Sequence, residues 1–316
     1  GLFPHSRVSG SDADLEEERR LCYVGMTRAQ RRLFLTSACR RRVFGEYRAT
    51  DPSRFIDEVP PELVQRYDFV GYTGYNAGAR GFPIPLGTVY STNLTSDNET
   101  GLGNWTDQQI IDAIIKGLRK DGSRQLPLMP YTLYSGMAQE DLKALVAYLR
   151  SLKPVKKATP ELKSSTPFMR SVGTELWLKA FGTFSESPAQ APKSGIQRGK
   201  YLTNHVAICG DCHTPRNSFG VPNQSLYMAG SPKDGPIGEV VPNITPDKET
   251  GIGDWKREEI AELLLTGVKP DYDNVQGLME EVIRGTTHGY KDMTKEDALA
   301  IADYLKSIPA IKNKIK

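Results

Sequence analysis

Residues 209–213 read Cys-Gly-Asp-Cys-His, and this pentapeptide says more about the chemistry of the chain than the rest of the sequence. Two thiols three positions apart are spaced to bond the two vinyl groups of one haem, and the His that follows directly is placed to bind its iron. A bare Cys-x-x-Cys is also typical of a zinc half-site or a thioredoxin-like dithiol. Zinc would need two further ligands, yet the other cysteines, Cys22 and Cys39, lie far upstream. The motif therefore predicts one covalent c-type haem.

The composition is that of an ordinary globular protein. A chain of 316 residues is long enough for two or three domains, and 38% of its residues are hydrophobic. No apolar run reaches about 18 residues, so we expect no transmembrane helix. The formal net charge of +3 is too small to indicate a nucleic acid or an anionic membrane as partner.

The two basic residue types are unevenly distributed along the chain. Residues 1–68 contain twelve Arg and no Lys, whereas residues 69–316 contain nine Arg and twenty Lys. This difference indicates two sequences of different origin, joined near residue 68. The chain begins at Gly1 and shows no basic-then-apolar signal peptide, so we expect a processed form or an internal fragment.

A repeat with an offset of 150 residues dominates the second part of the chain. The segment STNLTSDNETGLGNW (91–105) aligns with VPNITPDKETGIGDW (241–255). Apolar residues at helical spacing predict one amphipathic helix after each block and another at the end of each copy. These helices are expected at 107–118 and 257–268, and at 139–152 and 295–308. Two copies of one helical module follow from this pattern.

The same offset places Met129 opposite Met279. A thioether is the group that completes a low-spin His/Met haem iron, so Met279 is a candidate ligand. No Cys or His occurs between residues 40 and 204, so we expect the first copy to hold no c-type haem. Met129 is then either an orphan candidate ligand or a core methionine.

From about residue 70 to its end, the chain resembles the cytochrome c subunits of membrane-associated alcohol, aldehyde and gluconate dehydrogenases, and related diheme cytochromes c. The resemblance is carried by RGKYLTNHVAICGDCHTPRN (198–217), the two repeated blocks, LPLMPY (126–131) and the GLMEEV around Met279. It implies a mainly α fold made of tandem class I cytochrome-c-like modules, of which the first is incomplete.

The family pattern implies a role for each residue of the motif. It places Cys209 and Cys212 in thioether bonds to haem c, His213 on the proximal face of the iron and Met279 on the distal face. Pro215 occupies the place whose backbone carbonyl commonly orients the proximal imidazole.

One departure from the family pattern keeps the distal ligand open. Family members often have a small residue or Pro before the distal Met, whereas Leu128 and Leu278 stand there in this chain. Met293 and His288 are therefore rivals of Met279 as the distal ligand. The repeat favours Met279.

The resemblance also implies an organisation and a role. We expect an incomplete module at 69–153, a connector at 154–194 that packs against the modules, and a haem-carrying domain at 195–316. With one haem c, the chain would be an electron-carrier subunit rather than an enzyme by itself. It would accept electrons from a dehydrogenase and pass them to a quinone or an oxidase, in the periplasm or at the outer face of the inner membrane.

Residues 1–68 resemble another family, the UvrD-type superfamily 1 DNA helicases, at the end of their second motor domain. The stretch that carries this is LEEERRLCYVGMTRAQRRLFLTSACRRRVFGEYRATDPSRFIDEVP. A helix at 15–30 that opens with acidic residues and a strand at 31–37 predict a small α/β remnant. In that family the Arg of the YVxxTRA motif, here Arg28, contacts the terminal phosphate of ATP.

The rest of a nucleotide site is missing from the sequence. No Gly-x-x-x-x-Gly-Lys-[Ser/Thr] loop exists, so we expect no ATP hydrolysis and no unwinding. The Arg run at 40–42 is either a phosphate contact or a solvated charged face. A helicase fragment would imply the cytoplasm and free thiols, whereas c-type haem attachment implies an oxidising compartment in which Cys22 and Cys39 could pair. A chimeric reading frame that joins two genes is the remaining alternative.

Overall fold

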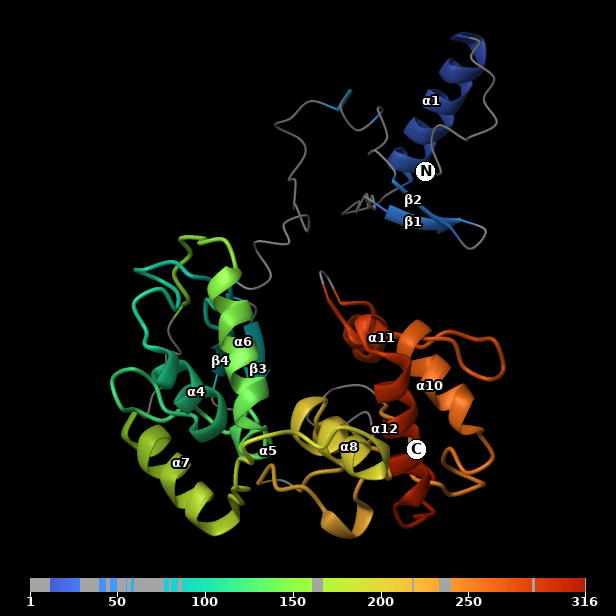
Figure 1. The fold of residues 1–316 in the computed structure, drawn as a ribbon. Helices are drawn as coiled ribbons and strands as arrows, with labels where there is room; N and C mark the ends of the chain where they lie inside the picture. Colours follow the sequence, from blue (N-terminus) through green and yellow to red (C-terminus); the bar gives the residue numbers. More distant parts are fainter. Residues whose placement is uncertain are drawn as a thin grey trace. The chain divides into compact units, whose positions relative to one another are not determined.

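The computed structural model divides the chain into two compact units, Gly1–Gly71 and Tyr72–Lys316 (Figure 1). The residues that the structure describes are 12–28, 40–43, 46–49, 55, 58–59, 77–79, 81–84, 87–160, 167–217, 219–232, 240–285 and 288–315.

The described part of the first unit contains one long helix, one hairpin, and residues 55 and 58–59. Helix α1 (Asp12–Thr27) begins three residues before its predicted start and carries Arg19, whose guanidinium donates hydrogen bonds to Glu58. Strands β1 (Arg40–Val43) and β2 (Glu46–Ala49) pair antiparallel. The strand predicted at 31–37 lies outside the described residues.

The second unit is mainly helical, which confirms the predicted fold class at that level. A hairpin of β3 (Gly81–Ile84) and β4 (Gly87–Tyr90) precedes its helices. The helices of the first module and the connector are α4 (Asp107–Lys116), α5 (Tyr131–Tyr134), α6 (Gln139–Ser151) and α7 (Pro167–Phe181). The second module contains α8 (Gly195–Tyr201), the π-helical turn η2 (Leu202–Val206), α9 (Cys209–His213), the 3-10 turn η3 (Gln224–Leu226), α10 (Arg257–Thr266), α11 (Gly277–Arg284), the 3-10 turn η4 (Tyr290–Asp292) and α12 (Lys295–Ser307).

Capping residues fix the ends of these helices. Thr106 and Gln109 form a capping box at the start of α4, and the Thr294 hydroxyl accepts the Asp297 N–H at the start of α12. Helices α4 and α10 both end at a glycine in the left-handed conformation, Gly117 and Gly267. The four predicted helices are therefore present, each within two residues of its predicted ends.

A buried asparagine organises the repeated block in both modules. Asn243 is 3% exposed; its amide donates to the Thr250 hydroxyl and the Ile311 carbonyl, and its carbonyl oxygen accepts from Thr245. Asn93 repeats this network in the first module, where its amide reaches the Val155 carbonyl. Each block is thereby tied to the segment that follows the last helix of its own module.

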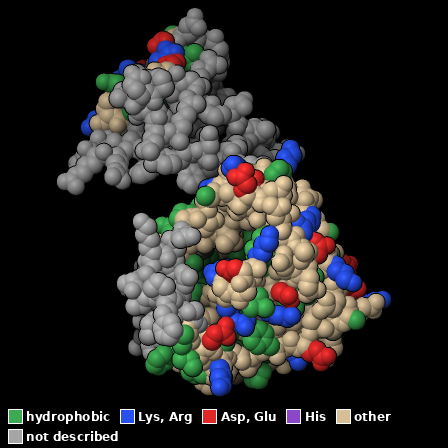
Figure 2. Space-filling model, turned by 90° about the vertical axis from the view of Figure 1, so that its left-hand side faces the viewer, with side chains coloured by type: hydrophobic (Ala, Val, Ile, Leu, Met, Phe, Trp, Pro, Cys, Tyr) green, Lys and Arg blue, Asp and Glu red, His purple; other side chains and the backbone are tan. Residues whose placement is uncertain are grey.

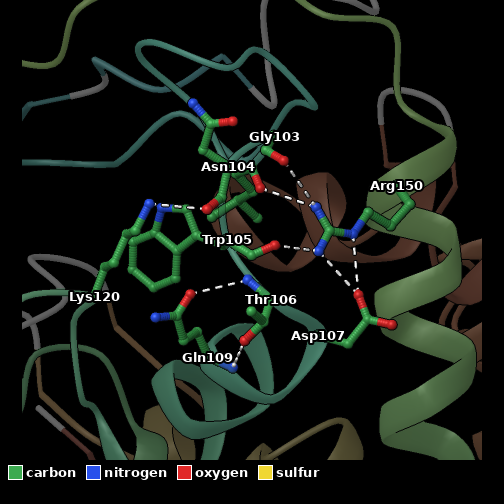
Figure 3. A network of polar contacts seen from close by, with 9 residues as sticks. Gly103, Asn104, Trp105, Thr106, Asp107, Gln109, Lys120 and Arg150 are labelled. Atoms are coloured by element: carbon green, nitrogen blue, oxygen red, sulfur yellow. Dashed lines mark hydrogen bonds and ion pairs between the residues drawn. The ribbon is translucent and has the colours of Figure 1, made fainter.

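A cation on the last helix of each module holds the end of the block. Arg150 of α6 donates to the carbonyls of Leu102 and Trp105 and pairs with the Asp107 carboxylate (Figure 3). In the second module, Lys306 of α12 donates to the Trp255 carbonyl at 2.6 Å. In both modules the closing helix therefore holds the end of the block in the same way.

Each module has its own hydrophobic core. The core of the first module consists of Ile110, Ile111, Ile115, Met137, Leu142, Val146 and Leu149. The second core combines apolar residues of α8, α10 and α12 with Met228 and Ile252, and Ala138 of the first module joins it. Helix α8 lies against α12 (Figure 1), and Gly199 allows this because a Cβ there would be 1.8 Å from the Ala300 carbonyl oxygen.

Helix α7 and the segment after it contact residues that precede and residues that follow them in the chain. In α7, Glu175 pairs with Arg124 of the first module at 2.6 Å. The Trp177 indole donates to the Phe219 carbonyl of the second module at 2.9 Å. Further along, the Phe184 ring stacks on Tyr131.

The surface carries both charge signs. On the face in view, cationic and anionic side chains of the described residues are interspersed (Figure 2). Among the described residues, no helix combines the length and the apolar character that a membrane crossing requires.

Candidate functional site

The Cys-x-x-Cys-His motif forms the short helix α9, reached through an unusual backbone. Helix α8 passes into the π-helical turn η2, in which the Ala207 N–H donates to the Leu202 carbonyl at 2.7 Å. Ile208 then adopts φ 46° and ψ 43°, a left-handed conformation that a β-branched residue rarely adopts. Such π-turns and strained residues are concentrated at functional sites.

The two cysteines share one helical turn, so their thiols project from the same side of α9. Both are free thiols in the structure. Cys209 is half-buried against the core of the second module, and burial raises the pKa of its thiol to about 12. Cys212 is exposed. Cys209 is therefore the less accessible of the two cysteines.

The imidazole of His213 is buried and oriented by a single hydrogen bond. Its Nδ1 lies 2.8 Å from the Pro242 carbonyl oxygen, so Nδ1 carries the donated proton and Nε2 is left with a free lone pair. Burial lowers the pKa of His213, which favours the neutral form that coordinates a metal. The side chain is 9% exposed.

The expectation that Pro215 supplies the orienting carbonyl is wrong. The carbonyl of Pro215 accepts the Asn223 N–H at 2.8 Å, because the chain turns back there. The bridge between Ser231 and Val241 instead brings Pro242 next to the imidazole. Sequence reasoning missed Pro242, which lies 29 residues from His213.

The candidate distal ligands differ in their surroundings. Met279 in α11 and Met293 after η4 are both partly buried and pack against the same core as Cys209. His288 is exposed; its Nδ1 lies 3.4 Å from the Asp292 carboxylate and its ring meets Tyr148 edge-on. Neither Asp292 nor Tyr148 belongs to the hydrophobic core against which Cys209 packs.

The repeat separates the two methionines. The closing helices begin at Gln139 and Lys295, an offset of 156, so Met293 is the counterpart of Met137. Met137 is 6% exposed in the core of the first module, which has no haem motif. A methionine at this position thus packs a core without any iron. Met279 has no such buried counterpart.

Met129, the counterpart of Met279, is 37% exposed. The interpretation of Met129 as a core methionine is therefore wrong. Its position after Leu128, which is 51% exposed, places it at the surface of the first module.

Two tyrosines near the motif also escaped the sequence analysis. Tyr134 and Tyr290 are related by the offset of 156, and each stands three residues before the core methionine of its module. The Tyr290 hydroxyl donates to the Ala207 carbonyl, at the entry to α9. The repeated Tyr-x-x-Met pattern was the available signal.

The structure describes two of the candidate side chains of the first unit. Arg28 is an exposed residue in the turn after α1. Cys22 is a half-buried free thiol whose pKa is raised by burial, and Cys39 lies outside the described residues.

Comparison with known proteins follows this division of the chain. Over 237 residues, 74% of this chain, the sequence is 34% identical to a diheme cytochrome c-type protein of Cereibacter sphaeroides, and the match covers 76% of that protein. The chain belongs to the diheme c-type cytochromes. This cytochrome is also 36% identical over 239 residues to the fructose dehydrogenase cytochrome subunit of Gluconobacter japonicus, covering 74% of this chain and 47% of that subunit.

A third relative is also named as a cytochrome subunit of a dehydrogenase. The cytochrome c subunit of the quinone alcohol dehydrogenase of Gluconacetobacter polyoxogenes is 36% identical over 245 residues, covering 74% of this chain and 51% of the subunit. The cytochrome spans about half the length of these two dehydrogenase subunits.

The first unit is similar to a different family of proteins. The family model of the UvrD-like helicase C-terminal domain matches residues 1–40. The ATP-dependent DNA helicase PcrA of Leuconostoc citreum is 54% identical over 65 residues, which are 21% of this chain and 9% of the helicase. A short helicase-like segment thus stands before the cytochrome modules.

Proposed function

We propose that the chain carries electrons through one covalently attached haem c in its second module. Cys209 and Cys212 would form the thioether bonds, and His213 would bind the iron through Nε2. The observation that carries this proposal is the hydrogen bond from Nδ1 of the buried His213 to the Pro242 carbonyl, directly beside two free thiols on one helical turn.

The surroundings of the motif fit a bound haem. Two thiols are present to form the thioether bonds, and a neutral imidazole and a methionine thioether are the axial pair of a His/Met haem. Among the described residues, Thr203 carries the one fully buried side-chain hydroxyl that lacks a hydrogen-bond partner, and it lies in η2, which packs on α9. A buried polar atom of this kind indicates that a partner is missing.

Met279 is the distal ligand in this proposal. It packs against the same core as Cys209, while its rival Met293 has a core counterpart in Met137 and His288 faces Asp292 and Tyr148. The second core would exclude water from the cofactor. When bound, the haem supplies reversible one-electron chemistry between Fe(II) and Fe(III).

The count of one haem rests on the first module. It repeats the second from its block to its closing helix, but no Cys or His occurs between residues 40 and 204. The proposed boundaries are therefore a haem-free module at 69–153, a connector at 154–194 and a haem module at 195–316, behind a helicase-like segment at 1–68.

The partners follow from the relatives. Two of them are named as cytochrome subunits of a fructose and an alcohol dehydrogenase, which supports a dehydrogenase as the electron donor. A quinone or an oxidase would be the acceptor, and the periplasm or the outer face of the inner membrane the location. All proposed haem ligands lie in the unit Tyr72–Lys316. For the helicase-like segment we propose no ATP hydrolysis.

An absorbance spectrum tests this function. Protein made together with haem-attachment machinery should show sharp reduced-minus-oxidised c-type bands, and the haem should stay with the chain after denaturation because it is covalently bound. The double variant C209A/C212A should lose them. A wild-type chain without such bands, in cells that mature another c-type cytochrome, would overturn the proposal.

A further inference from the structure

The segment that leads into the haem motif is held in a strained conformation. The π-helical turn η2 and the left-handed Ile208 follow one another directly before Cys209. Strained backbone of this kind persists only where the surrounding structure fixes it. The contacts around η2 and Ile208 therefore hold this segment in its conformation.

The first module supplies several of these contacts. Nδ1 of His205, in η2, lies 2.8 Å from the Leu133 carbonyl oxygen in α5. Gly136 lies against the same imidazole, because a Cβ at this position would be 2.4 Å from ring atoms of His205. The Tyr201 hydroxyl, just before η2, accepts the Ala138 N–H at 3.0 Å.

Two tyrosines also lie in the surroundings of η2 and α9. Tyr134 lies next to Leu133 in α5, and burial raises the pKa of its phenol to about 12. The Asp211 carboxylate in α9 also raises this pKa. From within the second module, Tyr290 holds the Ala207 carbonyl.

We propose that the first module, although it has no haem motif, serves as a clamp for the haem module. Its corner at 131–139 holds η2 and Ile208 in place through His205, and thereby fixes the position of α9 and its thiols. His205 and Gly136 are positioning residues in this proposal. The consequence for haem rests on the proposed function, whereas the clamp itself does not.

The clamp is tested first on the full chain without haem. Iodoacetamide alkylation of Cys209 is followed by peptide mass spectrometry, with Cys22 as the internal reference. His205→Ala removes one hydrogen bond that holds the segment closed. If the opening equilibrium of the segment rises by the factor that corresponds to this bond, alkylation of Cys209 should be roughly fivefold faster. His205→Asn keeps an N–H donor near the Nδ1 position and should restore most of the protection.

Two further variants make the test specific. Gly136→Val places a side chain against the imidazole and should accelerate alkylation as His205→Ala does. His288→Ala is the matched control, because the contacts of its ring are with Tyr148 of the first module and with Asp292. Equal Cys209 rates in wild type, His205→Ala and Gly136→Val would overturn the clamp.

A double-variant comparison tests the role of strain. Glycine adopts the left-handed conformation without a Cβ penalty, so Ile208→Gly should reduce the need for a clamp. The acceleration caused by His205→Ala should then be smaller in the Ile208→Gly variant than in the wild-type chain. The same ratio in both backgrounds would contradict the strain argument.

The haem-loaded protein gives the final readout. His205→Ala should lower the midpoint potential, because opening the lead-in admits water and water favours the ferric charge. His205→Asn and His288→Ala should stay at the wild-type value. An unchanged potential in His205→Ala would show that the clamp does not reach the haem, whereas a wild type without covalent haem would contradict the proposed function and leave the alkylation result standing.

Discussion

Met279 and Met293 pack against the same core, but the repeat gives them different roles. The counterpart of Met293 is buried in a module without a haem motif, so this side chain fills a core. Met279 lies in α11, with its counterpart at the surface. Two changes of identical chemistry can therefore be compared directly.

We predict that Met279→Ala opens the distal position of the iron. The ferrous protein should bind carbon monoxide readily, and its midpoint potential should fall because the thioether favours Fe(II). Met293→Ala should keep the wild-type ligation and lose about 1–2 kcal/mol of unfolding free energy, as expected for a partly buried methionine. Carbon monoxide titration and urea unfolding measure the two effects. The reverse assignment would follow if only Met293→Ala bound carbon monoxide.

Cys209, Cys212 and His213 could be proposed from the sequence because covalent haem attachment requires a fixed local spacing. The carbonyl that orients His213 could not, because Pro242 reaches it through a bridge between distant segments. Pro215, the local candidate, uses its carbonyl in a turn instead. Local chemistry is visible in the sequence, whereas a partner 29 residues away depends on the tertiary fold.

Among the elements, the repeated block is stabilised by a buried amide in both modules. Asn93 and Asn243 are 2% and 3% exposed, and each forms hydrogen bonds with the equivalent residues of its own module. Removing such a side chain leaves buried donors and acceptors without partners. The two positions therefore form a matched pair.

We predict that Asn243→Ala and Asn93→Ala each lower the unfolding free energy by about 2 kcal/mol. Both should do so because the first module has its own core and the same network. Chemical unfolding followed by tryptophan fluorescence reports on both modules, since Trp105 and Trp255 end the two blocks. If Asn243→Ala lowered the unfolding free energy and Asn93→Ala left it unchanged, the first module would not contain the buried asparagine network.

The same blocks make stability depend on acid pH. Hydrogen bonds from Thr100 and Thr250 lower the pKa of Asp97 and Asp247. A carboxyl whose pKa is lower in the folded state stabilises the fold above its unfolded pKa of about 3.9, and this contribution is lost as the pH falls through the folded pKa. We predict that urea midpoints fall below pH 4 and that Asp97→Asn/Asp247→Asn weakens this dependence. An identical pH profile in the double variant would contradict it.

The helices themselves were predictable from apolar spacing, and their ends from capping residues. The lead-in to α9 was not, because a π-turn and a left-handed Ile208 contradict local preference. Such a conformation depends on contacts made elsewhere, here those of Leu133 and Gly136. Propensity alone would have continued α8 into the motif.

For the whole molecule, the break in Arg and Lys usage near residue 68 lies close to the boundary between the two units at Gly71. A helicase match over 65 residues and a cytochrome match over 237 residues divide the chain in the same way. The sequence alone suggested both resemblances, since each rests on a specific local motif. It did not show that the first module still forms the contacts that surround the haem motif.

The intact mass of the mature protein tests the central claim most directly. The full chain, produced with haem-attachment machinery and analysed under denaturing conditions, should carry the mass of one haem, and C209A/C212A should carry none. One haem agrees with attachment in the second module alone. A wild-type mass without added haem, or with two haems, would contradict the account.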